Sequence, residues 1–246
     1  MAIICAKYLR AYDNQFNWDI NTNGESYFAR SVLESIPGVV FDVGANVGTY
    51  TSMCLSISDA TAVHSFEISP PTFVTLKQAC ANIQNARLNC FGLGAVNQEI
   101  KIYHARDSTD RTSILPVADG FKREVLESKI RTGDAYMTEN RIEKISILKI
   151  DAEGADLNVL LGFSDAFDSN RIAAVQFEHG EPDIESRTLL KDKLYFLHSK
   201  KLRTFRLFPN CLEEIKQYDY SIEDFRGSNY VALTNTTAEF LARQIS

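Results

Sequence analysis

The chain has 246 residues, of which 45% are hydrophobic, and it carries a formal net charge of −6 without any block of lysine and arginine, which argues against a nucleic-acid partner. Its five cysteines are widely spaced and never form a C-x-x-C pair, so neither a disulfide framework nor a zinc knuckle is predicted. No apolar run approaches the roughly 18 residues of a membrane span and the first residues do not form a secretory signal, so we expect a cytoplasmic protein.

Apolar strands alternate with amphipathic segments along the chain, which is typical of a parallel sheet with helices on both faces. The first predicted elements are a helix over 26–35, a strand over 39–44, a helix over 48–58, a strand over 62–67, a helix from Pro70 to about Asn82 and a strand over 88–93. Two segments of alternating polarity are predicted to be exposed strands or extended arms on either side of a polar stretch: 99–104 and 124–130, with 107–119 between them.

The second half of the chain continues the same alternation. It predicts a strand over 145–150, a helix opened by Gly154, a strand over 172–177, a helix over 186–200 and an antiparallel edge pair over 203–208 and 229–234. No repeat or low-complexity linker divides the sequence. A single domain over 1–246 is therefore predicted, with an N-terminal segment, 1–36, ahead of a core, 37–246.

The stretch from residue 39 to residue 51 joins an apolar strand to a helix through an acidic, glycine-bearing turn. Gly44 permits a sharp bend and Gly48 permits close packing of the helix, whose N-terminus presents free N–H groups. Such a turn serves NAD, FAD or S-adenosylmethionine. A dinucleotide would need glycine in place of Asn46, and Asp42 would repel a diphosphate. Asp42 and Asn46 suit the ammonium and carboxylate of a methionine moiety, directly or through water.

A second short apolar strand ends in Glu67. This acid follows Gly44 by about 20 residues, the spacing expected for a carboxylate that accepts hydrogen bonds from ribose hydroxyls. The alternative is a solvated charge at the end of a strand. Together with the first motif, Glu67 favours a nucleoside cofactor without phosphates.

Three sequence blocks resemble the FkbM family of S-adenosylmethionine-dependent methyltransferases. They are 42–51, 66–70 and, most specifically, the run Lys-Ile-Asp-Ala-Glu-Gly at 149–154. The resemblance covers roughly residues 37 to 180. It implies a class I (Rossmann-like) methyltransferase fold, an α/β three-layer sandwich with a mostly parallel seven-stranded sheet and an antiparallel edge.

The resemblance also implies S-adenosylmethionine as the cofactor and a hydroxyl of a sugar, glycan precursor or natural product as the acceptor. It places Thr51, in the first block, and Ile68, where the family commonly has proline, in the cofactor site with the residues named above. It further places the polar loop 108–113 near the cofactor. The predicted cofactor-binding residues are Asp42, Gly44, Asn46, Gly48, Thr51, Glu67, Ile68 and Asp151.

Polar residues at the carboxyl ends of the later strands are the candidates for chemistry, because ligands of open α/β sheets bind at that edge. Asp151 is placed beside both the sulfonium and the acceptor, and His179 has an intrinsic pKa near neutrality. Glu153 is a third candidate, or only a favourable partner of a helix dipole. Lys149 faces away from its strand neighbours and is expected to bridge the acids. No metal site is predicted, although Asp151, Glu153, Glu178 and His179 include suitable ligand types.

Two questions stay open at this point. A non-catalytic cofactor-binding partner or scaffold module is the alternative function, and a nicotinamide oxidoreductase is a third that Asn46 disfavours. The sequence does not name the acceptor or the oligomeric state. Aromatic residues of the N-terminal segment either cap a sugar by stacking or pack that segment onto the core: Tyr8, Tyr12, Phe16, Trp18, Tyr27 and Phe28.

Overall fold

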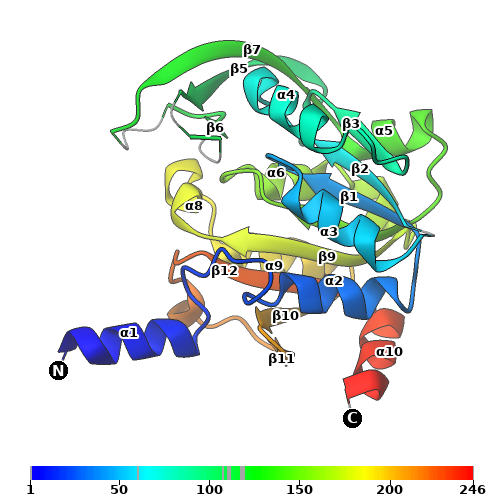
Figure 1. Ribbon diagram of the computed structural model, residues 1–246. Coiled ribbons are helices and arrows are strands. Elements are labelled where there is room, and N and C mark those ends of the chain that lie inside the picture. Colours follow the sequence, from blue (N-terminus) through cyan, green and yellow to red (C-terminus); the bar gives the residue numbers. More distant parts are fainter. Residues whose placement is uncertain (1, 60, 107, 110–111, 117–119, 246) are drawn as a thin grey trace.

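The computed structural model describes residues 2–59, 61–106, 108–109, 112–116 and 120–245 (Figure 1). Its helices are α1 (Ala2–Tyr12), α2 (Glu25–Leu33), α3 (Thr49–Ile57), α4 (Pro70–Ala79), α5 (Gly133–Glu139), α6 (Asp156–Leu161), α7 (Ser164–Asp168), α8 (Glu181–Ser186), α9 (Leu190–Ser199), the 3-10 turn η1 (Tyr220–Ile222) and α10 (Asn235–Ile245). Among these described residues, no helix is long and apolar enough to cross a membrane.

The strands form two sheets. The main sheet contains β1 (Val39–Val43), β2 (Ala62–Phe66), β3 (Ala86–Asn89), β8 (Ile145–Ile150), β9 (Ile172–His179), β10 (Arg203–Phe208), β11 (Cys211–Glu214) and β12 (Ser228–Leu233). Its order is β11-β10-β12-β9-β8-β1-β2-β3, and β12 runs antiparallel to both of its neighbours. The predicted antiparallel pair is present as β12 and β10, but β11 lies outside it at the edge of the sheet. The predicted number of seven strands is wrong: the main sheet has eight strands among the described residues, because β11 pairs with β10.

Strand side chains alternate between the two faces of the main sheet and build a core on each. On one face, Phe41 and Leu148 pack with α5, α6, α7 and α9. On the other face, Val40 and Ile147 pack with α2, α3 and α10. Figure 1 shows the helices on both sides of the strands. The predicted three-layer α/β architecture is confirmed.

The predicted strand over 88–93 is divided between two sheets. Its first part belongs to β3, whereas Gly92 and Leu93 form β4 and pair with β7 (Arg123–Arg131) in a second sheet. That sheet has the order β4-β7-β5-β6, with β5 (Gln98–Ala105) and β6 (Thr112–Ser113). The alternating segments predicted as exposed strands or arms are thus paired with each other over β5 and β7. In Figure 1 this second sheet arches over one end of the main sheet.

The predicted helix over 186–200 is also divided. The backbone of Arg187 is left-handed, with φ of 57°, and it separates α8 from α9. The N-H of Thr188 then bonds to the carbonyl of Asp183, which closes α8. α8 directly follows β9 at the carboxyl edge of the sheet, and there a Cβ at Gly154 would lie 2.5 Å from the carbonyl oxygen of Pro182.

Candidate functional site

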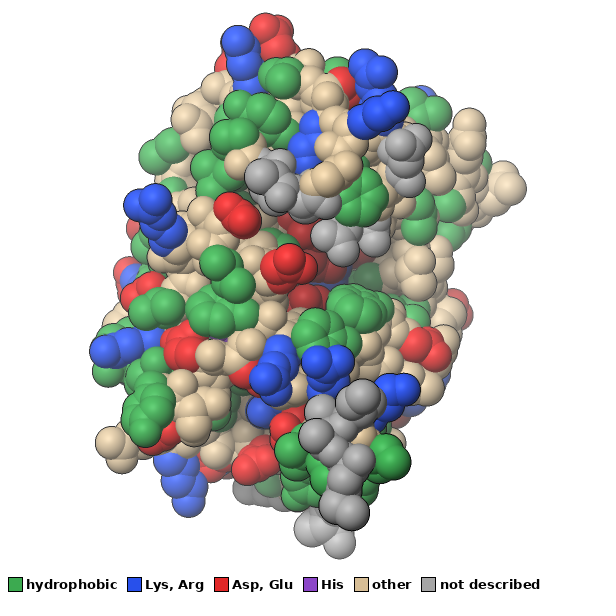
Figure 2. Space-filling model, turned by 90° about the vertical axis from the view of Figure 1, so that its left-hand side faces the viewer, with side chains coloured by type: hydrophobic (Ala, Val, Ile, Leu, Met, Phe, Trp, Pro, Cys, Tyr) green, Lys and Arg blue, Asp and Glu red, His purple; other side chains and the backbone are tan. Residues whose placement is uncertain are grey.

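A cleft lies at the carboxyl ends of β1, β2 and β8 and encloses about 700 Å³ of empty space, its open mouth included. Figure 2 views the molecule from this edge and shows Asp and Glu side chains gathered in a central hollow. The second sheet and the turns after three parallel strands contribute the lining: Val43, Gly44, Asn46, Phe66, Glu67, Ile68, Gly92, Leu93, Thr109, Thr112, Ile114, Ile130, Asp151, Ala152, Glu153 and Ala155.

The turn after β1 brings backbone close to backbone beside the cleft. Gly44 has φ of +78°, and a Cβ there would lie 1.8 Å from the carbonyl oxygen of Asp151. Only glycine fits this position. Asn46 also has a left-handed backbone, with φ of 48°, and its Oδ1 is buried without a hydrogen-bond partner among the described residues. An unpaired acceptor beside a cleft fits a ligand that donates a hydrogen bond.

Glu67 ends β2 and lies on the floor of the cleft. Its carboxylate accepts hydrogen bonds from the N–H of Asn46 at 3.0 Å and from the N–H of Ser69 at 2.8 Å. Burial raises the pKa of Glu67 to about 7, against the lowering effect of these two donors. A carboxylate has about four acceptor sites, so two stay available for the ribose hydroxyls expected from the sequence.

Three of the predicted cofactor residues do not line the cleft. Asp42 is fully buried, and its Oδ2 accepts a hydrogen bond from the hydroxyl of Thr51 at 2.7 Å. Thr51 in turn contacts Ser65. Gly48 starts α3, where a Cβ would lie 2.8 Å from the side chain of Leu76. In this structure these residues hold the turn and α3 against the sheet.

Lys149 bridges two of the carboxylates, as its alternation along the strand predicts. Its Nζ lies 3.2 Å from Asp151 Oδ2 and 3.6 Å from Asp42 Oδ1. Burial disfavours the charged amine, but the charges of Asp151 and Asp42 outweigh it and raise the pKa of Lys149 above its usual range. Lys149 therefore stays an ammonium and fixes the position of the Asp151 carboxylate.

Asp151 lies where the cleft meets a second, smaller cavity of about 380 Å³. Its carboxylate is 43% exposed, so it reaches open space while Lys149 holds one of its oxygens. The smaller cavity, here called the polar cavity, is lined by Asn17, Trp18, Asn23, Glu25, Lys149, Ile150, Asp151, Glu178 and Asn229. Asp151 is the residue that both cavities share in the part of the chain that is described.

The two other residues predicted for chemistry lie elsewhere. Glu153 lines only the larger cleft, in a left-handed backbone ahead of Gly154. His179 lines neither cavity. It is fully buried, with Nδ1 at 2.9 Å from Asp183 Oδ2 and Nε2 at 3.2 Å from Glu223 Oε2. The structure therefore brings Asp151 and Glu153 to the cleft and leaves His179 inside an ionic cluster.

Sequence reasoning missed the side of the cleft that the second sheet supplies. Thr112, Ile114 and Ile130 come from β6, the turn after it and β7, and Gly92 and Leu93 come from β4. Thr109 and Thr112 belong to the polar loop expected near the cofactor, whereas residues 110 and 111 of that loop lie outside the described residues. The alternating pattern of 99–104 and 124–130 signalled strands but not where they dock.

No group of three or more His, Cys, Asp or Glu side chains among the described residues has an arrangement that would hold a metal ion. The donor set of the cleft instead fits a nucleoside with an amino-acid tail. Ile68 and Leu93 offer apolar surface suited to a flat ring, Glu67 offers acceptors suited to a diol, and Asn46 offers an unpaired amide oxygen.

Comparison with known proteins identifies the family of the sequence. The sequence matches the Methyltransferase FkbM domain over residues 42–222. It is 26% identical over 182 residues to the hexuronic acid methyltransferase AglP of Haloferax volcanii, a match that covers 72% of this chain and 73% of that protein. A solved precorrin-6y C5,15-methyltransferase from Geobacter metallireducens GS-15 superposes with a TM-score of 0.47 at 10% identity, over 85% of this chain and 87% of that one. Because the family match spans more than half of the sequence, the chain belongs to the FkbM family of methyltransferases.

Proposed function

We propose that the protein transfers a methyl group from S-adenosylmethionine to a hydroxyl group of a sugar, with the cofactor in the larger cleft. The observation that carries this proposal is the place of Asp151. Asp151 lines both the cleft that fits the cofactor and a polar cavity that fits a hydroxylated acceptor, and its side chain is 43% exposed. The acceptor oxygen must come close to the methyl carbon of the cofactor, and Asp151 is where the cleft and the polar cavity adjoin.

The bound cofactor would supply an activated methyl group and leave as S-adenosylhomocysteine. We assign to this chain the task of aligning the acceptor oxygen and removing its proton. As the oxygen forms its bond to the methyl carbon and the carbon–sulfur bond breaks, the hydroxyl proton passes to the Asp151 carboxylate. Lys149 positions that carboxylate from the buried side.

The larger cleft would bind the cofactor through a small set of residues. We propose that Glu67 accepts hydrogen bonds from the ribose, that Asn46 and the turn at Gly44 contact the methionine moiety, and that Ile68 packs on the adenine. Asp42, Gly48 and Thr51 would support this site from behind. Glu153 would contact the cofactor only.

The class of acceptor is inferred from the relative and from the lining of the polar cavity. The relative AglP is a hexuronic acid methyltransferase, and the polar cavity presents amide and carboxyl groups that suit hydroxyls. His179 would be structural, because carboxylates enclose both of its ring nitrogens away from either cavity. We further expect the protein to act in the cytoplasm on an acceptor that is not a nucleic acid.

The first prediction tests this assignment with Asp151→Asn. Calorimetry should show that wild type and variant bind S-adenosylhomocysteine with affinities within about threefold, because the amide preserves the shape of the side chain. Transfer of labelled methyl from S-adenosylmethionine into the oligosaccharide fraction of the source cells should fall at least about 100-fold, the usual size of a general-base contribution.

Asp168→Asn is the matched control, since Asp168 pairs with Lys200 on the surface and should leave transfer unchanged. A wild-type protein that fails to bind S-adenosylhomocysteine contradicts the cofactor assignment. Undiminished transfer by Asp151→Asn contradicts the role of Asp151.

A further inference from the structure

The polar cavity contains polar side chains that lack partners within the protein. Asn229 is only 7% exposed, yet its side-chain amide has no hydrogen-bond partner among the described residues. Glu178 is the register partner of Asn229 across β9 and β12, and its carboxyl group likewise has no hydrogen-bond partner in the described structure. Side chains as buried as Asn229 are nearly always paired, so an unpaired Asn229 beside the partly buried Glu178 favours a ligand in the cavity.

Two glycines leave space for the Glu178 carboxyl group. A Cβ at Gly180 would lie 2.9 Å from Glu178 Oε1, and a Cβ at Gly227 would lie 3.1 Å from the same atom. Both distances are tighter than ordinary contacts. The backbone around Glu178 is therefore shaped to let this carboxyl group face the cavity.

The charges around the polar cavity do not balance. Three acidic residues line the cavity: Glu25, Asp151 and Glu178. Lys149 is the one cation that lines it in the described part of the chain, and Asp42 lies behind Lys149. Lys149 is already engaged with Asp42 and Asp151. Glu25 accepts hydrogen bonds only from the neutral amides of Asn23 and Gln176. Glu25 and Glu178 therefore form no ion pair of their own among the described residues, and they share the charge of Lys149 with Asp42 and Asp151.

This imbalance is independent of the cofactor. Asp151 borders both cavities and would face a sulfonium, but Glu25 and Glu178 line only the polar cavity. Burial and the neighbouring charge of Asp151 raise the pKa of Glu178 to about 8, although the charge of Lys149 lowers it. A ligand cation would supply the missing partner.

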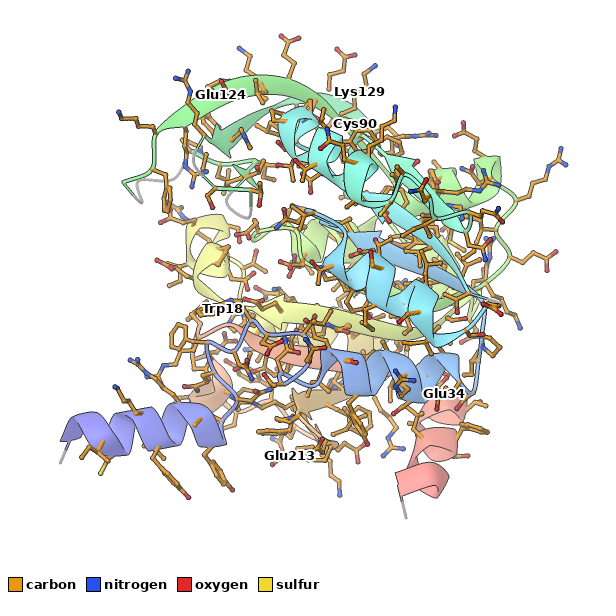
Figure 3. All side chains as sticks on the ribbon, viewed as in Figure 1. Trp18, Glu34, Cys90, Glu124, Lys129 and Glu213 are labelled. Carbon is orange, nitrogen blue, oxygen red and sulfur yellow. The ribbon has the colours of Figure 1, made fainter. Side chains whose placement is uncertain are left out.

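An aromatic side chain completes the lining. Trp18, between α1 and α2, is 69% exposed at the mouth of the cavity, and Figure 3 shows it on the side of the molecule to which β9 runs. An indole face attracts a cation through its quadrupole and also packs on the C–H face of a sugar ring. The combination of unpaired carboxyl groups and an open indole is suited to an ammonium ion.

We propose that the polar cavity is the acceptor subsite for an aminated sugar, in which an ammonium group pairs with Glu178 and Glu25 while a neighbouring hydroxyl reaches Asp151. This inference rests on the proposed function and narrows its substrate class. A hexuronic acid would bring its carboxylate against Asp151 and against Glu25 and Glu178, whose pKa values burial already raises, and Lys149, the lining lysine among the described residues, is already engaged, so the cavity discriminates against it.

The second prediction tests this selectivity with probes that differ only in charge. Full-length protein saturated with S-adenosylhomocysteine is titrated with galactosamine, galactose and galacturonic acid at pH 7, and dissociation constants are measured by ligand-observed NMR. Galactosamine should bind at least ten times more tightly than galacturonic acid. Equal binding, tighter binding of the uronic acid, or binding of none of the sugars overturns the proposal.

Variants identify the groups responsible. Glu178→Gln should reduce the preference for galactosamine over galacturonic acid to about threefold or less, whereas Trp18→Ala should weaken galactosamine and galactose together. Glu213→Gln, on the exposed edge strand β11, removes one acidic charge from a distant surface and should change nothing (Figure 3).

Binding of S-adenosylhomocysteine to each variant shows that it is folded. The same measurement distinguishes a failure of the proposed function from a failure of the proposed acceptor. Loss of nucleoside binding by the wild type contradicts the proposed function, whereas intact nucleoside binding without charge selectivity contradicts only the aminated acceptor.

Discussion

Gly44 lies in the turn that follows β1, where the backbone of Asp151 leaves no room for a side chain. Gly44→Ala places a Cβ 1.8 Å from the carbonyl oxygen of Asp151, so the turn or the backbone at the end of β8 must move. We expect a loss of about 3 kcal/mol or more in unfolding free energy by urea titration. We also expect at least tenfold weaker binding of S-adenosylhomocysteine.

Gly120 offers the matched control for this substitution. Its φ of +83° is close to that of Gly44, but a Cβ there would meet nothing within 4 Å. Gly120→Ala should therefore cost only the left-handed backbone strain, about 1–2 kcal/mol, and leave nucleoside binding intact. Equal effects at the two positions would mean that backbone strain, and not the contact with Asp151, makes Gly44 necessary.

The sequence predicted correctly which residues reach the cleft when those residues follow a strand, and less well when they lie within one. Gly44, Glu67 and Asp151 come after their strands or at the turn, and all three line the cleft. Asp42 lies inside β1 and shares the side of the sheet with Val40, which packs in the core with α2 and α3. The alternation of a strand therefore turns Asp42 away from the cleft that Val43 reaches.

A buried ionic cluster behind the site joins α6, α8 and α9 and is expected to stabilise their packing. Lys193 on α9 is fully buried and donates to Asp156 of α6 at 3.1 Å and to Asp183 of α8 at 2.9 Å. Lys193→Met would leave the buried Asp156 without a cation and Asp183 with His179 as its remaining ion-pair partner among the described residues. Breaking such a cluster usually costs about 3–5 kcal/mol, which urea unfolding would measure.

Lys200, next to the end of α9, provides the comparison. It pairs with Asp168, whose side chain is 64% exposed, so Lys200→Met should cost no more than about 1 kcal/mol. Because α8 follows the end of β9, we also expect Lys193→Met to weaken sugar binding in the polar cavity. A loss below about 1 kcal/mol for Lys193→Met would show that the cluster does not hold these elements together.

The elements of the main sheet were predictable from local pattern, whereas the second sheet was not. Alternation over 99–104 and 124–130 identified strands, but pairing between β5 and β7 depends on contacts that no local pattern encodes. The strand over 88–93 is continuous in local pattern, but β3 pairs with β2 whereas Gly92 and Leu93 pair with β7. Gly92 lies against Ile68, and a Cβ there would lie 2.8 Å from that side chain.

Folding of the whole molecule buries two carboxyl groups of the site, Glu67 and Glu178, and thereby favours their protonated forms. Burial raises the pKa of Glu67 to about 7 and that of Glu178 to about 8, from an ordinary 4.5. The folded state therefore binds more protons than the unfolded state above pH 4.5, and stability falls as pH rises through this range. Burial lowers the pKa of His64 from 6.5 to about 4, which has the opposite effect below pH 6.5.

The two carboxyl groups dominate between pH 6.5 and 8, because His64 is neutral there in the folded state and its half protonation at pH 6.5 in the unfolded state opposes them by only about 0.4 kcal/mol. With about 1.4 kcal/mol per unit of pKa, Glu67 and Glu178 together should make the ligand-free protein about 2 kcal/mol less stable at pH 8 than at pH 6.5. Urea unfolding at the two pH values measures the difference. The double variant Glu67→Gln, Glu178→Gln should flatten it, and Glu213→Gln should not. Equal or greater stability of the wild type at pH 8 would mean that these carboxyl groups are ionised in the folded protein, and that the empty site already satisfies the charges which we assign to a ligand.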